Sequence, residues 1–177
     1  MADTGFKVTG AVVSNAWGQI PVTTTRINTS DNSRAETTLN NNSYEVATLN
    51  NYTFGVPSGA TIDGIELVAE FSDFDASTEA YVRCSLSWNN ETNYTATKED
   101  YVVGSTDATK TYGGPADTWG HAFTVAELAD GTFLVKLEGR TGGTFGDRYC
   151  RLDYLAIKVY YTPSGGAPDT SKFFIMF

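Results

Sequence analysis

Apolar and polar residues alternate in three stretches of the chain. In residues 65–71 the odd positions are apolar and two of the three even positions are acidic, and residues 82–88 and 133–138 follow the same period of two. This period places one face of a strand on the core and the other in water, as in antiparallel sandwiches. The residues that we expect between two packed sheets are Ile65, Leu67, Phe71, Val82, Leu86, Trp88, Phe133, Val135, Leu137, Ile157 and Val159.

A longer strand is predicted over residues 149–161, and its apolar positions change phase along the way. Leu152 lies on one phase, whereas Ile157 and Val159 lie on the opposite one. A strand that changes face in this manner predicts a β-bulge or bend at residues 153–156. The alternative is a strand that is covered on both faces.

Shorter runs predict weaker strands, and they are separated by turns rich in Asn, Gly and Pro. These strands are expected at residues 6–13, 20–27, 43–48, 52–56, 93–98 and 101–103. One short helical turn is predicted at residues 124–129, because Thr124 and Glu127 have the spacing of a capping box. Strand-sized runs that recur about every ten residues predict an all-β fold, an antiparallel β-sandwich of two sheets.

The composition agrees with such a fold and excludes several functions. A chain of 177 residues is long enough for one core without disulfides. Its net charge of -9 excludes nucleic acid and an anionic membrane surface as default partners. The start has no basic segment followed by a long apolar one, so we expect no signal peptide and no transmembrane helix. Cys84 and Cys150 lie in apolar runs and are interpreted as buried free thiols, with a disulfide between them as the alternative.

The chain is expected to consist of one domain, residues 1–162, and a terminal segment, residues 163–177. The terminal segment begins with a linker rich in Pro and Gly, which disfavour regular pairing. It ends in large apolar residues, which predict docking into a neighbouring chain as a strand or plug. The alternative is that the segment folds back on its own sandwich. The docking residues would be Phe173, Phe174, Ile175, Met176 and Phe177.

The residue pattern does not favour catalysis. His121 is the single histidine, and no Gly-x-Ser-x-Gly motif supplies a nucleophile for it. We therefore expect no enzyme, no cofactor and no metal centre. The close pair Asp73 and Asp75 is typical of any acidic chain, and a calcium loop at residues 72–75 is the alternative interpretation.

Aromatic side chains form a further set of candidates. An exposed planar ring stacks on the face of a sugar, so exposed aromatic residues would form a glycan-binding platform. The alternative is that these rings fill the core or close the ends of the sandwich. The candidates are Trp17, Tyr94, Tyr101, Tyr112 and Trp119.

Residues 54–66, FGVPSGATIDGIE, resemble a module of tailed-phage structural proteins. The resemblance continues through VRCSLSW at residues 82–88, DTWG at residues 117–120 and VYYT at residues 159–162, and it covers roughly residues 50–162. It implies a β-sandwich of jelly-roll type, similar in shape to carbohydrate-binding modules and built into virions as a capsid decoration or tail-associated subunit. No catalytic residues are carried over.

The resemblance also implies partners and a location. The partners would be other copies of the chain, other virion structural proteins, or both, and the protein would assemble in the host cytoplasm and reside in the virion. The alternative is a carbohydrate-binding or adhesive module on a phage or bacterial surface, with a surface glycan as its ligand. A row of solvent-facing rings would favour the glycan, whereas rings lying under a partner would favour the virion role.

Overall fold

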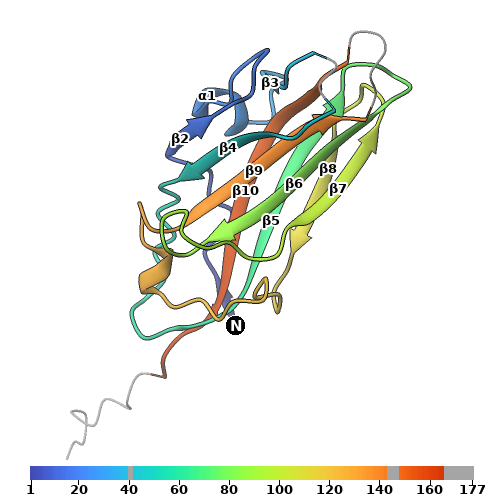
Figure 1. Ribbon diagram of the computed structural model, residues 1–177. Coiled ribbons are helices and arrows are strands. Elements are labelled where there is room, and N and C mark those ends of the chain that lie inside the picture. Colours follow the sequence, from blue (N-terminus) through green and yellow to red (C-terminus); the bar gives the residue numbers. More distant parts are fainter. Residues whose placement is uncertain (40–41, 143–147, 166–177) are drawn as a thin grey trace, which may run out of the picture.

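The computed structural model describes residues 1–39, 42–142 and 148–165. It is a sandwich of two antiparallel sheets with five strands each (Figure 1). In sheet A, β1 and β3 both pair with β10, and β10 continues to β5 and β8. Its strands are β1 (Ala2–Asp3), β3 (Ala35–Glu36), β5 (Thr61–Asp73), β8 (Ala108–Gly113) and β10 (Cys150–Thr162). Sheet B has the order β2 (Ala11–Asn15), β4 (Glu45–Asn50), β9 (Leu134–Thr141), β6 (Glu79–Ser87), β7 (Lys98–Val103).

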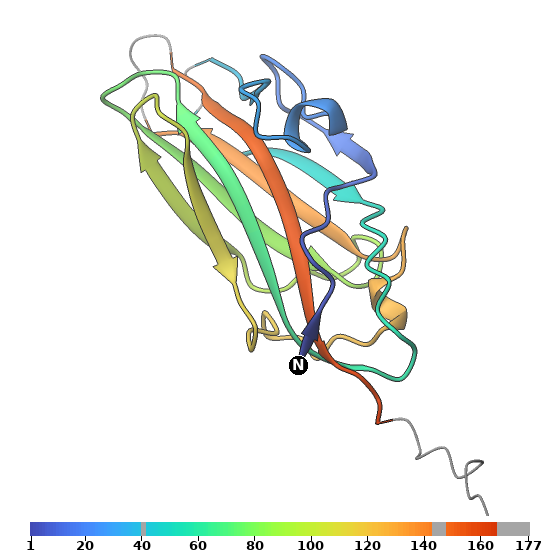
Figure 2. The same cartoon turned by 180° about the vertical axis from the view of Figure 1, so that it is seen from behind.

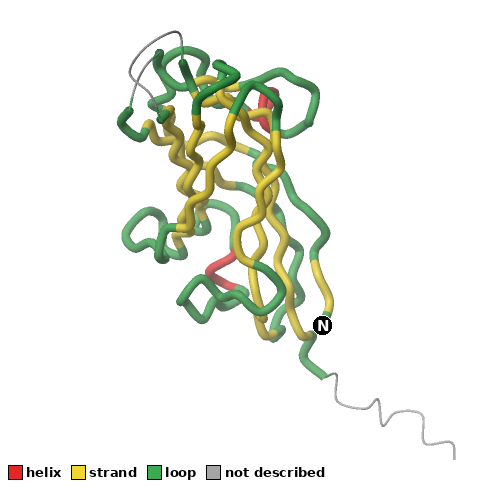
Figure 3. The backbone as a smooth tube through the Cα atoms, turned by 90° about the vertical axis from the view of Figure 1, so that its right-hand side faces the viewer, coloured by secondary structure: helices red, strands yellow, loops and turns green. Residues whose placement is uncertain are grey.

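The core lies between the two layers, which Figure 3 shows from the side. All the predicted core residues except Trp88 are at most 1% exposed, which confirms the inward face of each alternating strand. Trp88 follows the end of β6 and is only partly buried, so it packs against the rim of the core. The predicted all-β fold is confirmed, with very little helix and two antiparallel sheets in a jelly-roll-like sandwich.

The predicted bulge in the last strand is present at Asp153. Leu152 pairs with Phe71 of β5, and Tyr154 pairs with Glu70, so Asp153 is the extra residue on β10. Leu152 and Leu155 are both fully buried because the bulge shifts the alternation by one position. Figure 2 shows β10 and β5 side by side over most of their length.

Two predicted strands are wrong. Residues 20–27 contain the helical turn α1 (Thr24–Ile27), in which the amide of Ile27 bonds to the carbonyl of Thr23. Burial of Ile27 against the core fixes this turn in spite of its β-branched residues. Residues 52–56 form no strand, because Thr53 and Gly55 have positive φ angles of 49° and 68°.

Other elements differ in extent. Residues 6–13 contribute the start of β2 and an isolated bridge at Lys7, and residues 93–98 contribute a bridge at Tyr94 and the first residue of β7. The predicted helical turn is the 3-10 helix η1 (Ala126–Leu128), shorter than expected. Its capping box is confirmed, since Thr124 N donates to Glu127 Oε2 (2.7 Å) and Glu127 N donates to Thr124 Oγ1 (3.3 Å).

The N-terminus and the last described residues of the chain lie at one end of the sandwich. β10 pairs with β1 through Tyr161 and Ala2, and the chain leaves the sandwich beside the N-terminus (Figure 1). The predicted docking residues 173–177 lie outside the described residues. Within the described part of the chain, no helix is long and apolar enough to cross a membrane. Cys84 and Cys150 are buried free thiols, as predicted.

Candidate functional site: a tyrosine–arginine face on sheet B

Sheet B presents a row of aromatic and charged side chains on its outer face. Tyr81 on β6 pairs with Tyr101 on β7, and their ring centroids lie 5.6 Å apart. Tyr101 is 48% exposed and Val103, two residues further along the same edge strand, is 60% exposed. Successive residues of a strand point to opposite faces. Val82 and Val102 point inward and are buried, so Tyr81, Tyr101 and Val103 point outward.

An ion pair fixes the middle of this face. Arg83 on β6 lies opposite Glu138 on β9, and its Nε and Nη2 donate to the two carboxylate oxygens at 3.0 Å each. These hydrogen bonds are the main reason that the pKa of Arg83 is raised. Lys136 lies 3.3 Å from the same carboxylate, which is almost fully buried. The pair is therefore a rigid anchor, since its geometry is bidentate and Glu138 is shielded from water.

Tyr44, which precedes β4, lies across the neighbouring strands. The guanidinium carbon of Arg83 lies 3.6 Å from the centroid of its ring, and its hydroxyl donates to Glu99 on β7. Arg140 on β9 stacks on Tyr81 at 3.8 Å and lies 5.0 Å from Tyr44. Rings and guanidinium groups thus alternate across three strands, held by cation–π contacts. We call this set the tyrosine–arginine face, and its members are Tyr44, Tyr81, Arg83, Tyr101, Glu138 and Arg140.

Of the predicted aromatic candidates, Tyr101 lies on sheet B and Tyr94 lies beside it. Tyr101 is the exposed end of the tyrosine–arginine face. Tyr94 is half-buried, bridges to Ser87 and has Lys136 Nζ 5.5 Å from its ring centroid. The structure therefore places both candidates where a ring reaches solvent from the outer side of the sandwich.

For the other three candidates the prediction of a glycan-binding ring is wrong. Trp17, Tyr112 and Trp119 are each only 3% exposed and cannot stack on a sugar. Hydrogen bonds from the polar group of the ring explain why two of the three are buried. Tyr112 Oη donates to the carbonyl of Val82 (3.0 Å), and Trp119 Nε1 donates to the carbonyl of Ile65 (2.9 Å). A buried ring with a satisfied donor is a core residue, so the alternative interpretation holds for Tyr112 and Trp119.

Trp17 packs in the core against a glycine of sheet B. A Cβ atom at Gly139 on β9 would lie 2.6 Å from Trp17 Cζ2, so the indole occupies the space that a side chain there would need. The ring covers a strand of sheet B directly and closes one side of the core.

His121 packs between an aromatic ring and a carboxylate. Its ring stacks on Trp88 with centroids 3.9 Å apart, and its Nε2 lies 3.3 Å from Glu127 Oε1. Burial acts to raise the pKa of Glu127, but hydrogen bonds from Thr124 and the charge of His121 outweigh it, so this pKa is lowered. Over residues 1–39, 42–142 and 148–165, no serine, threonine or cysteine hydrogen-bonds the imidazole, as a nucleophile would.

An open cleft of about 240 Å³ lies between the loop that follows β4 and the segment around η1. Asp130 joins its two sides by accepting hydrogen bonds from the amide and hydroxyl of Thr53, both at 2.9 Å. The cleft shares no residue with the tyrosine–arginine face. Its lining residues are Thr53, Phe54, Gly55, Val56, Val125, Leu128, Ala129 and Asp130.

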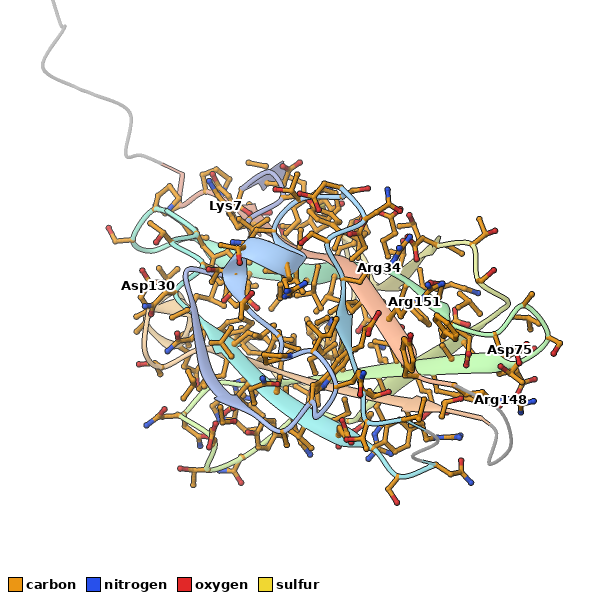
Figure 4. All side chains as sticks on the ribbon, turned by 90° about the horizontal axis from the view of Figure 1, so that it is seen from above. Lys7, Arg34, Asp75, Asp130, Arg148 and Arg151 are labelled. Carbon is orange, nitrogen blue, oxygen red and sulfur yellow. The ribbon has the colours of Figure 1, made fainter. Side chains whose placement is uncertain are left out.

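Carboxylates that could hold a metal ion gather elsewhere. Glu70, Asp107 and Asp153 each offer an oxygen, and these oxygens lie within 4.8 Å of one another. The predicted calcium loop is different: Asp73 accepts hydrogen bonds from Thr141 Oγ1 and from an amide, and Asp75 lies 3.7 Å from Arg148 (Figure 4). The carboxylates of the loop 72–75 are thus occupied by hydrogen bonds and an ion pair within the protein. Among the described residues, the group with metal-ligating geometry is the cluster of Glu70, Asp107 and Asp153.

No protein-family model matches the chain, and no curated protein matches it. The fold therefore rests on the structure itself. The resemblance to a module of tailed-phage structural proteins stays a prediction.

The sequence patterns missed Tyr44, Tyr81, Arg83 and Arg140. A usable signal existed for Tyr81, which is an aromatic residue on the polar phase of a strand whose other phase is apolar. A large ring on the water-facing phase of a strand points out of the core and onto the outer face of the sheet. Tyr44 carried no such signal, because it precedes its strand and reaches its partners only in the folded sheet.

Proposed function

We propose that this protein is a non-enzymatic structural subunit of a virion, a capsid decoration or tail-associated accessory protein. In this role the tyrosine–arginine face contacts a neighbouring protein subunit. The face is the observation that carries the proposal, and the resemblance of residues 50–162 to modules of tailed-phage structural proteins supports the virion as the place. The proposal gives the chain no catalytic step.

The chemistry of the face suits a protein partner. Tyrosine and arginine are enriched at the energetic centres of protein interfaces, where a ring or guanidinium group is desolvated by the partner. Arg83 and Tyr44 are already held by Glu138 and Glu99, so binding would cost little side-chain entropy. Tyr101 and Val103 add exposed apolar surface at the free edge of the sheet.

The apolar tail is the second contact in this proposal. Phe173, Phe174, Ile175, Met176 and Phe177 would dock on a neighbouring copy or on the particle. Two weak contacts on one chain reinforce each other when many copies are fixed together, because the second contact forms at a high effective concentration.

The test is incorporation into particles. The wild-type chain should be found by mass spectrometry in gradient-purified particles from the host strain that carries its gene. The variant Tyr101→Ser should be incorporated about tenfold less or worse, as expected for truncation of an interface anchor. Thr111→Ser, an exposed change on the edge strand β8 of sheet A, is the matched control and should be incorporated normally. Absence of the wild-type chain from particles would contradict the virion role, and equal incorporation of both variants would contradict the face.

A carbohydrate-binding role is the second candidate, favoured by the cross-strand pair of Tyr81 and Tyr101 on an open surface. A sugar ring would stack on Tyr101. Binding to a glycan array that is lost in Tyr101→Ser but kept in Tyr101→Phe, which retains the ring, would support it. A wild-type chain that binds no glycan on the array would exclude the glycans tested.

A further inference from the structure

Three carboxylates from distant parts of the chain meet on sheet A. Glu70 lies on β5, Asp107 immediately precedes β8, and Asp153 is the bulged residue of β10. Their oxygens lie within 4.8 Å of one another. Calcium binds oxygen ligands at about 2.3–2.6 Å, so ligands on opposite sides of one ion lie about 4.6–5.2 Å apart. The three oxygens therefore fit around a single calcium ion.

The charges of the cluster are incompletely balanced. Arg34 pairs with Asp107, with Nε 3.0 Å and Nη2 2.5 Å from Oδ2, and Ser72 Oγ donates to Oδ1 of the same carboxylate (2.6 Å). The side chain of Glu70 makes no hydrogen bond or ion pair with any residue that the structure describes. Three carboxylates facing one guanidinium group leave two negative charges, which is the charge that one divalent cation neutralises. Figure 4 shows Arg34 beside β10.

Asp153 provides a second, independent observation. Its side chain belongs to a residue that is 1% exposed, and its Oδ1 is buried without a hydrogen-bond partner. A buried carboxylate oxygen with no partner is costly, and a bound cation would remove that cost.

The backbone explains why Asp153 occupies this place. The bulge inserts Asp153 between the pairs Leu152–Phe71 and Tyr154–Glu70, so it stands next to Glu70 without belonging to the regular alternation. Bulges re-aim single side chains and often lie at functional sites.

We propose that Glu70, Asp107 and Asp153 bind one calcium ion, which joins β5, β10 and the start of β8 at this end of sheet A. Water molecules and nearby backbone oxygens would complete the coordination. The site is independent of the virion role and differs from the sequence-based expectation of no metal centre. The competing explanation is that Asp153 stays protonated and no cation binds.

The experiment uses the full chain, stripped with EDTA, at about pH 7.5 where ordinary carboxylates are ionised. Isothermal titration with CaCl₂ should show saturable binding of one ion, and calcium should raise the melting temperature relative to EDTA. Asp153→Asn and, separately, Glu70→Gln should each weaken calcium binding about tenfold or more, as loss of a charged ligand does. Asp63→Asn, at the other end of β5, is the matched control and should bind as the wild type does.

Two outcomes would overturn the proposal. One is the absence of heat and of any melting shift up to about 10 mM calcium, beyond the range of weak extracellular sites. The other is calcium binding that persists undiminished in the Glu70→Gln variant. Glu70 is only half-buried, so this variant keeps the test decisive if Asp153→Asn does not fold.

Discussion

Tyr112 on β8 donates a hydrogen bond to the backbone carbonyl of Val82 on β6, at 3.0 Å, so that one side chain links the two sheets across the core. We expect Tyr112→Phe to lower the free energy of unfolding by about 1–2 kcal/mol, because it leaves a buried carbonyl without this donor. Urea denaturation followed by fluorescence measures the change. Tyr101→Phe removes an exposed hydroxyl and should have almost no effect, and an equal loss in both variants would refute the role of the inter-sheet bond.

Gly139→Ala should destabilise the sandwich. Its Cβ atom would lie 2.6 Å from Trp17 Cζ2, so the indole or the strand must shift, and overpacking of this kind costs about 1–3 kcal/mol. Gly114→Ala is the control, since a Cβ there meets no atom within 4 Å. Thermal unfolding of the two variants should separate them clearly, and a stable Gly139→Ala variant would contradict the packing of Trp17.

Glu127 should contribute to stability in a pH-dependent manner. Its folded pKa lies below the ordinary value of 4.5, so its contribution is present above that value and is lost as the pH falls through the folded pKa. Glu127→Gln should therefore be less stable than the wild type at pH 7, by up to about 1 kcal/mol, because the charge-assisted bonds to Thr124 and His121 are weakened.

The difference between wild type and Glu127→Gln should shrink as the pH falls below 4.5 and through the folded pKa, because the wild-type carboxylate then becomes protonated. Urea denaturation across this pH range tests the slope. Glu91→Gln, at an exposed turn, serves as the control. A difference that stays constant with pH would show that the substitution acts through packing and not through the charge of Glu127.

The two thiols should be unreactive in the folded protein. Cys84 and Cys150 are fully buried, and burial raises the pKa of each, so neither access nor thiolate is available to a reagent. Ellman's reagent should detect neither thiol in the native chain and both in denaturant. Rapid labelling of either cysteine without denaturant would contradict this burial.

Removal of residues 164–177 should affect assembly and not folding, if the tail docks on a neighbour. The melting temperature of the isolated sandwich should stay nearly unchanged, whereas incorporation into particles should be lost. A full-length chain with its five apolar tail residues changed to serine should lose incorporation as the deletion does, because it keeps the length of the tail without the docking side chains. A deletion that lowers the free energy of unfolding by several kcal/mol would show that the tail packs on its own core.

The sequence by itself determined the sandwich, the inward faces of its central strands and the bulge in β10. Alternation in residues 65–71, 82–88 and 133–138 was sufficient because burial of one strand face is a local, period-two constraint. The bulge near Asp153 was predictable for the same reason, since an extra residue shifts the phase of the apolar positions. The capping box of Thr124 and Glu127 also depends only on local spacing.

The edge strand β8 was decided only by the tertiary structure. β8 has alternating residues that are mostly polar on both faces, so nothing in its pattern marked it as a strand or showed that Tyr112 points inward. Tyr101 stands on a similar edge strand and points outward. The difference between the two rings comes from which side of each strand faces the opposite sheet, and this depends on long-range pairing.

The two candidate sites likewise required the fold. Tyr44 meets Arg83, and Glu70 meets Asp107 and Asp153, across strands that are far apart in sequence. Sequence spacing carries no information about such meetings, because strand order and register set which side chains share a face. The apolar pattern determined which residues prefer burial, and the pairing of β5, β8 and β10 decided which charged residues became neighbours.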